Sequence, residues 1–211
     1  MNETHRPQVL PDHYKKVGYL GTDRWVSYGN QVREILYCQP ERVLEVGIGN
    51  GIVCDALGNL GFSVTTLDID PALRPTVVGS VTKMPFPAAS FDFLLVAEVL
   101  EHLPFEDFSR ALSEIHRVTA RYAYVTLPHA GAVFLDVCEL PLLPHLQLFF
   151  KLPFFWSRHV FNGEHYWELG KRGYSVRRIR REILRAGFHI VKSGIYSQDP
   201  AHYYFLLTKH E

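Results

Sequence analysis

The sequence predicts a doubly wound α/β fold built on a mainly parallel sheet of seven strands. Short apolar runs alternate with amphipathic helical patterns along the chain, and the first run ends in a glycine-rich turn that opens a helix. Several runs are apolar throughout, as strands buried on both faces of a sheet are. With 211 residues, 47% of them hydrophobic, the chain is long enough for one domain with a full core, over residues 1–211.

The elements are expected in the following order. Residues 1–40 form an N-terminal arm and a helix capped by Asp23, and later helices cover residues 50–60, 104–118 and 176–186, the last capped by Ser175 and closed by Gly187. Strands cover residues 42–46, 62–67, 76–79, 91–97, 122–127, 188–193 and 203–208, with the last strand antiparallel.

Residues 128–173 interrupt this alternation. The segment is rich in aromatic residues, leucine and proline and is too long for a plain loop. We expect an inserted cap of one or two short helices over the site. Its aromatic residues would line an apolar acceptor pocket or, alternatively, form the cap's own core: Phe149, Phe150, Phe154, Phe155, Trp156 and Phe161.

Charge and composition narrow the classes of partner. The chain has 22 basic and 22 acidic residues, so no overall field attracts it to nucleic acid, and we expect a small-molecule partner. The three cysteines lack CxxC spacing, which favours a reducing compartment, and the chain shows neither a signal peptide nor a transmembrane segment. We therefore expect a cytoplasmic monomer or homodimer and assign no metal ligands.

The turn after the first strand indicates a nucleoside ligand. Gly47, Gly49 and Gly51 let a ligand approach the main chain at the start of a helix, whereas the dinucleotide fingerprint needs a glycine where Ile52 stands. Glu45 would repel a pyrophosphate but suits a cationic amino group. Asp68, at the end of the second strand, can accept hydrogen bonds from both hydroxyls of a ribose.

Four blocks of the chain, taken in order, resemble the class I S-adenosylmethionine-dependent methyltransferases of the small-molecule branch called type 11. They are residues 43–51, 67–70, 84–92 and 97–103, and the resemblance continues more loosely over residues 164–208. It implies a Rossmann-like fold, S-adenosyl-L-methionine as cofactor and S-adenosyl-L-homocysteine as product.

The resemblance also implies roles for individual residues. Glu45 and the glycine turn would hold the methionine part of the cofactor, Asp68 its ribose and Ile69 its adenine. Ser80 stands where the family commonly has an acidic residue for the adenine amino group, and a hydroxyl is a weaker acceptor. Val81 and Ala97 would complete the cofactor site.

The methyl acceptor needs a base only if its attacking atom carries a proton to be lost. His129, which follows the fifth strand, and His102, which follows the fourth, are the candidates. The function that these observations favour is methyl transfer to a small, apolar or aromatic molecule. The alternatives are a catalytically silent protein that binds the same cofactor for regulation and a nicotinamide-dependent oxidoreductase, against which Ile52 and Glu45 count.

Overall fold

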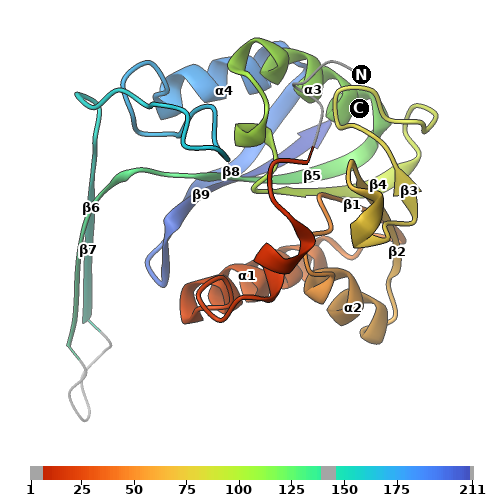
Figure 1. Cartoon of the computed structure of the whole chain (residues 1–211), viewed down its shortest axis with the longest axis horizontal. Helices are drawn as coiled ribbons and strands as arrows, with labels where there is room; N and C mark the ends of the chain where they lie inside the picture. The colour runs from red at the N-terminus through yellow and green to blue at the C-terminus, as the bar shows by residue number, and fades with distance from the viewer. Residues whose placement is uncertain (1–6, 139–145, 210–211) are drawn as a thin grey trace.

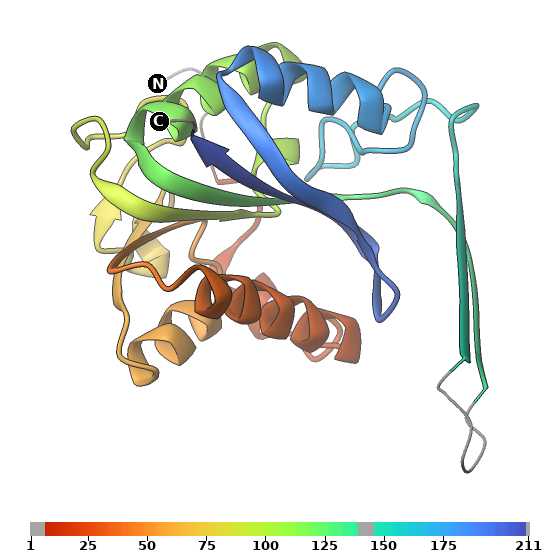
Figure 2. The same cartoon turned by 180° about the vertical axis from the view of Figure 1, so that it is seen from behind.

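A computed structural model describes residues 7–138 and 146–209 of the chain. Its main body is a twisted sheet of seven strands with helices on both faces (Figures 1 and 2). The strands are β1 (Arg42–Val46), β2 (Ser63–Asp68), β3 (Val77–Val78), β4 (Phe91–Ala97), β5 (Thr119–Pro128), β8 (Phe188–Tyr196) and β9 (Asp199–Lys209).

The order across the sheet is β3-β2-β1-β4-β5-β9-β8. Strands β1 to β5 pair in parallel, and β9 runs antiparallel to both β5 and β8. The chain leaves β1 toward β2 and β3, then returns to the other side of β1 with β4. The order therefore reverses between β1 and β4, which is where doubly wound sheets bind ligands. The predicted fold class is confirmed.

Helices α1 (Thr22–Cys38) and α2 (Ile52–Asn59) cover one face, and α3 (Phe105–Val118) and α4 (Val176–Arg185) cover the other (Figure 1). Successive side chains of β4 point to opposite faces of the sheet, so this strand contributes to the apolar core on each face. Phe93 and Leu95 pack with Ile35 of α1, whereas Leu94 and Val96 pack with the apolar stripes of α3 and α4. Because these β4 side chains are fully buried, truncating Leu94 to alanine should cost about 2–5 kcal/mol of stability.

Local signals set most helix ends. Ser175 caps α4 as predicted, since its side chain accepts a hydrogen bond from the Arg178 amide. Asp23 is not a cap: α1 begins one residue earlier, after Gly21, and no side chain caps it. Helix α2 begins at Ile52 because Gly51 takes a left-handed conformation with φ of 77°.

The segment after β5 differs most from its prediction. Its described residues form no helix over the site but an antiparallel hairpin, β6 (Gly131–Cys138) and β7 (Leu146–Pro153), that extends away from the sheet (Figure 1). Residues 139–145 lie outside the described part. Most of the aromatic residues expected in a pocket or core are exposed, among them Phe150, Phe155, Trp156 and Phe161.

Residues 154–175 return to the body as turns and loops. Trp167 is fully buried against Phe105 and Phe108 of α3, and its indole nitrogen donates to the Leu103 carbonyl at 3.1 Å. The Tyr166 amide donates to the Glu101 carbonyl at 2.9 Å. This return brings His165 beside the carboxyl end of β4. Among the described helices, none is long and apolar enough to cross a membrane.

Candidate functional site

A cavity opens at the carboxyl ends of β1, β2 and β4, at the reversal of strand order. Its wall includes eight of the nine residues predicted to bind a cofactor: Glu45, Gly47, Gly49, Asp68, Ile69, Ser80, Val81 and Ala97. The ninth, Gly51, does not line the cavity but caps α2, where its amide donates to the Ile48 carbonyl at 2.9 Å. Gly51 therefore contributes to the site through the turn that it forms between Ile48 and the start of α2.

The glycine turn has a conformation and a closeness of packing that residues with side chains would not tolerate. Gly47 and Gly49 have φ of 81° and 54°, in the left-handed region that other residues rarely adopt. A Cβ at Gly47 would come within 2.5 Å of the Val99 side chain, and one at Gly49 would meet the ring of Tyr14 at 3.6 Å. Both glycines line the cavity, so a ligand there would meet the main chain of this turn.

Glu45 is a buried carboxylate at the end of β1. Its side chain is 5% exposed, and its Oε2 atom has no hydrogen-bond partner. Burial, with Asp55 and Asp68 nearby, raises the pKa of Glu45 to about 8. An unpaired carboxyl in this position fits a ligand that brings a positive charge or hydrogen-bond donors.

Asp68 ties β2 to the glycine turn. Its two carboxylate oxygens accept hydrogen bonds from the amides of Ile48 and Asp70, each at 2.9 Å. Burial raises the pKa of Asp68, while these amide bonds oppose the increase. Because each oxygen has a second lone pair, the fixed carboxylate can still accept from two hydroxyls.

Ser80 and Val81 close the far end of the cavity. The Ser80 hydroxyl lies 2.9 Å from the Thr82 hydroxyl, and this contact fixes the orientation of the Ser80 side chain. Val81 is 5% exposed and supplies an apolar wall beside Ile69.

The N-terminal residues supply a wall that the sequence analysis missed. Tyr14, Tyr19, Arg24 and Tyr28 all line the cavity. Tyr14 lies on η2 (Pro11–Lys15), and burial raises its pKa to about 12. Arg24 stacks over the Tyr19 ring at 4.6 Å. The signal available in the sequence was the concentration of tyrosine in an otherwise polar arm.

Glu98, the first residue after β4, is a second site residue to which the sequence alone assigned no role. It lines the cavity and has φ of 55°, a strained conformation for glutamate that is typical of functional sites. Its carboxylate accepts from the Thr126 hydroxyl at 2.9 Å and lies 3.4 Å from the His202 ring. The His202 ring also contacts the Asp199 carboxylate at 2.6 Å. Burial lowers the pKa of His202, but the charges of Glu98 and Asp199 outweigh burial, and the net effect is a raised pKa.

The two predicted bases have different positions. His102, on η4 (Leu100–His102), lines the cavity, and its Nδ1 lies 2.9 Å from both the Gln8 side chain and the Glu164 carbonyl. Burial and the neighbouring His165 lower the pKa of His102. His129 is not on the cavity wall: it packs against Tyr203 and Gly170, and burial lowers its pKa to about 4.

Comparison with known proteins decides the family. A model described as a methyltransferase domain matches residues 44–127, the stretch from the middle of β1 to the last residues of β5. Residues 44–127 belong to this methyltransferase domain family. The family predicted from the sequence is thereby confirmed. No sequence among the curated proteins matches this chain.

Solved structures share the fold over most of this chain. The magnesium protoporphyrin IX methyltransferase ChlM from Synechocystis PCC 6803, with bound S-adenosylhomocysteine, has a TM-score of 0.62 at 13% identity over 89% of this chain and 84% of its own. The 1,6-didemethyltoxoflavin-N1-methyltransferase of Burkholderia thailandensis, also with S-adenosylhomocysteine, has a TM-score of 0.57 at 16% identity over 98% and 93%.

A third solved structure carries the methyl donor itself. The glycopeptide N-methyltransferase MtfA complexed with S-adenosyl-L-methionine has a TM-score of 0.58 at 11% identity over 86% of this chain and 87% of its own. The cofactor and product predicted from the sequence are thus the ligands named for proteins with this fold.

Proposed function

We propose that this chain is an S-adenosylmethionine-dependent methyltransferase that acts on a small molecule. The observation that carries the proposal is the buried Glu45 carboxyl, whose Oε2 atom has no hydrogen-bond partner, beside the glycine turn, with the Asp68 carboxylate tied to the same turn. A ligand with an ammonium group at one end and ribose hydroxyls in its middle would satisfy both. The matched methyltransferase domain supports the same ligand.

When bound, S-adenosylmethionine supplies a methyl group activated by its sulfonium. The protein then has to align that group with an acceptor and exclude water. In this proposal Glu45 holds the ammonium group, Asp68 the ribose hydroxyls, and Ile69 and Val81 the adenine. Tyr14 closes over the glycine turn.

The acceptor would approach from the carboxyl end of β4, where Glu98 and His102 line the cavity. Glu98 is positioned by Thr126 and His202 and can hold a proton lost by the acceptor. His102 lines the cavity at this end, whereas His129 does not line it and has no role in the proposed reaction. The exposed aromatic residues of the hairpin do not support an apolar acceptor.

Two further proposals concern context. We propose a cytoplasmic location, supported by the free thiols of Cys38, Cys54 and Cys138. A small-molecule acceptor is supported by the structural neighbours, which are named for 1,6-didemethyltoxoflavin and magnesium protoporphyrin IX.

Product formation tests the proposal. The purified protein is incubated with S-adenosylmethionine and a cell extract filtered free of macromolecules, and S-adenosylhomocysteine is measured over time. We expect release above the extract-free rate, and its loss in the Gly49→Val variant. Tight binding of S-adenosylmethionine without any release from diverse acceptor pools would instead support the catalytically silent binder.

A further inference from the structure

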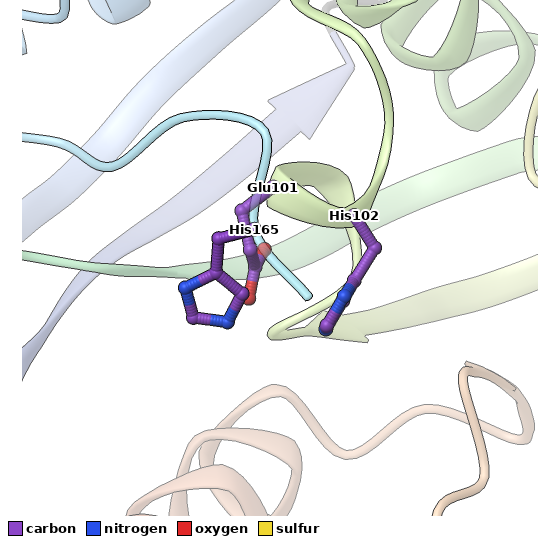
Figure 3. A group of neighbouring side chains, drawn as sticks. All are labelled: Glu101, His102 and His165. Atoms are coloured by element: carbon purple, nitrogen blue, oxygen red, sulfur yellow. The ribbon is translucent and has the colours of Figure 1, made fainter. Parts of the chain in front are cut away.

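Glu101, His102 and His165 form a cluster beside the proposed active site. Glu101 and His102 lie on η4, and His165 lies on the returning loop next to it (Figure 3). Their ligand atoms all lie within 4.8 Å of one another. Two imidazoles and one carboxylate at this spacing are the ligand types of catalytic transition-metal sites.

The Glu101 side chain is the observation that points to a ligand. It is fully buried, at 0% exposure, and neither carboxylate oxygen has a hydrogen-bond partner. An unpaired buried carboxylate is costly, and the neighbouring Glu98 carboxylate adds repulsion. A cation between Glu101 and the two histidines would remove both costs.

The surroundings of the histidines fit metal ligands. The Nδ1 atom of His102 is engaged by Gln8 and the Glu164 carbonyl at 2.9 Å, and that of His165 lies 3.4 Å from Glu168. These contacts leave Nε2 of each ring available. A metal-binding histidine typically donates its other nitrogen to a carboxylate or a backbone carbonyl in this way, which fixes its tautomer and orientation.

The backbone around His165 is also held in place. Its amide donates to the Asn162 side chain at 2.7 Å, and its carbonyl lies 2.8 Å from the His159 ring. Glu168 is held by Lys171 at 2.8 Å. The loop therefore presents His165 to η4 without depending on a ligand to order it.

We propose that Glu101, His102 and His165 bind a divalent first-row transition metal ion. Imidazole ligands favour Zn²⁺, Co²⁺, Fe²⁺ or Mn²⁺ over Mg²⁺, which prefers oxygen. Three protein ligands leave coordination positions open, and His102 lines the cavity, so water or an acceptor oxygen would complete the site. This last step rests on the proposed function, but metal binding itself does not.

Cobalt binding tests the site directly. The whole chain, freed of metal by a chelator, is titrated with Co²⁺ while the visible d–d absorption of the ion is followed. We expect saturation at about one equivalent per chain and competition by Zn²⁺ but not by Mg²⁺. Glu101→Gln and His165→Gln should each weaken Co²⁺ binding about tenfold or more, and His189→Gln, an exposed histidine on β8, should match the wild type.

Folding and cofactor binding are measured on the same samples. Co²⁺ should raise the Tm of the wild type and of His189→Gln but not of Glu101→Gln; if Glu101→Gln does not fold, the less buried His165→Gln takes its place. Absence of a saturable spectrum, or equal binding by all variants, would overturn the metal site. S-adenosylmethionine binding without Co²⁺ binding would overturn the metal site and leave the proposed function intact. Co²⁺ binding without S-adenosylmethionine binding would overturn the proposed function and leave the metal site intact.

Discussion

At the scale of single residues, the glycine turn is the feature most sensitive to change. Gly49→Val would place a β-branched residue at φ of 54° and direct its side chain toward Tyr14. The left-handed conformation costs a residue with a Cβ about 1–3 kcal/mol, and the added methyl groups enter the space proposed for the cofactor. We expect binding of S-adenosylmethionine to be lost by calorimetry while the far-UV circular dichroism is retained.

Gly58→Ala is the matched control for Gly49→Val. Gly58 is an exposed residue of α2, and a Cβ there meets nothing within 4 Å. This substitution should leave cofactor affinity unchanged and stabilise the helix by about 0.5–1 kcal/mol. If Gly49→Val bound the cofactor like the wild type, the site would lie elsewhere.

Glu45 gives a prediction for pH dependence in the absence of cofactor. Burial raises its pKa from 4.5 to about 8, so between these values the folded chain keeps a proton that the unfolded chain has released. The contribution of Glu45 to the free energy of unfolding is therefore largest below the unfolded pKa. It falls as the pH rises toward 8, by up to about 1.4 kcal/mol per pH unit. Glu45→Gln should remove this slope in urea unfolding between pH 5 and 8.

Glu41→Gln, an exposed glutamate just before β1, serves as the control and should keep the slope. Glu45→Gln should also weaken S-adenosylmethionine binding about tenfold, because the amide offers no negative charge to the ammonium group. An unchanged slope in Glu45→Gln would mean that Glu45 does not retain its proton on folding.

At the scale of elements, agreement between prediction and structure follows burial. The bounds of β1 and β4 match the predicted residues 42–46 and 91–97, because strands buried on both faces read as continuous apolar runs. The same rule does not hold for residues 128–173, where β6 and β7 leave the apolar side chains of Phe134 and Phe150 exposed.

The residues of the site also divide into those that local sequence could predict and those that it could not. Residues held by one strand end and the turn after it, such as Glu45 and Asp68, could be predicted from local sequence. Tyr14, His165 and His202 could not, because they reach the site through contacts between distant segments. His202 lies near the start of β9, which the antiparallel direction of that strand brings to the carboxyl end of β4.

The N-terminal element is predicted to contribute to cofactor affinity. Tyr14 lies over Gly49 with its ring in contact distance, so Tyr14→Ala removes one wall of the cavity. We expect S-adenosylmethionine to bind about tenfold more weakly and to dissociate faster, as followed by stopped-flow fluorescence. Leu10→Ala is the control, since Leu10 is 79% exposed in the same segment and does not line the cavity. Equal affinities of the two variants would show that the arm has no part in the site.

At the scale of the whole molecule, the sheet and its site form a unit to which the hairpin contributes little. Phe134 and Phe150 pair across β6 and β7 and are 54% and 60% exposed. The double substitution Phe134→Ser, Phe150→Ser should therefore change unfolding free energy by no more than about 0.5 kcal/mol per site. Calorimetric scanning should show a Tm shift of roughly 1–3 °C with cofactor affinity unchanged.

The matched comparison for the hairpin is Phe108→Ala, which empties a fully buried position of α3. It should cost about 3–5 kcal/mol and lower the Tm far more than the double hairpin variant. A large loss of stability or of cofactor binding in the hairpin variant would show that β6 and β7 support the body after all.

We propose that the cavity at the ends of β1, β2 and β4 holds an adenosyl cofactor. Calorimetric titration of the purified chain with S-adenosylmethionine, S-adenosylhomocysteine and NADH in parallel tests it most directly. We expect saturable one-to-one binding of the two adenosyl ligands, weakened in Glu45→Gln, and no binding of NADH. Binding of NADH alone would contradict it.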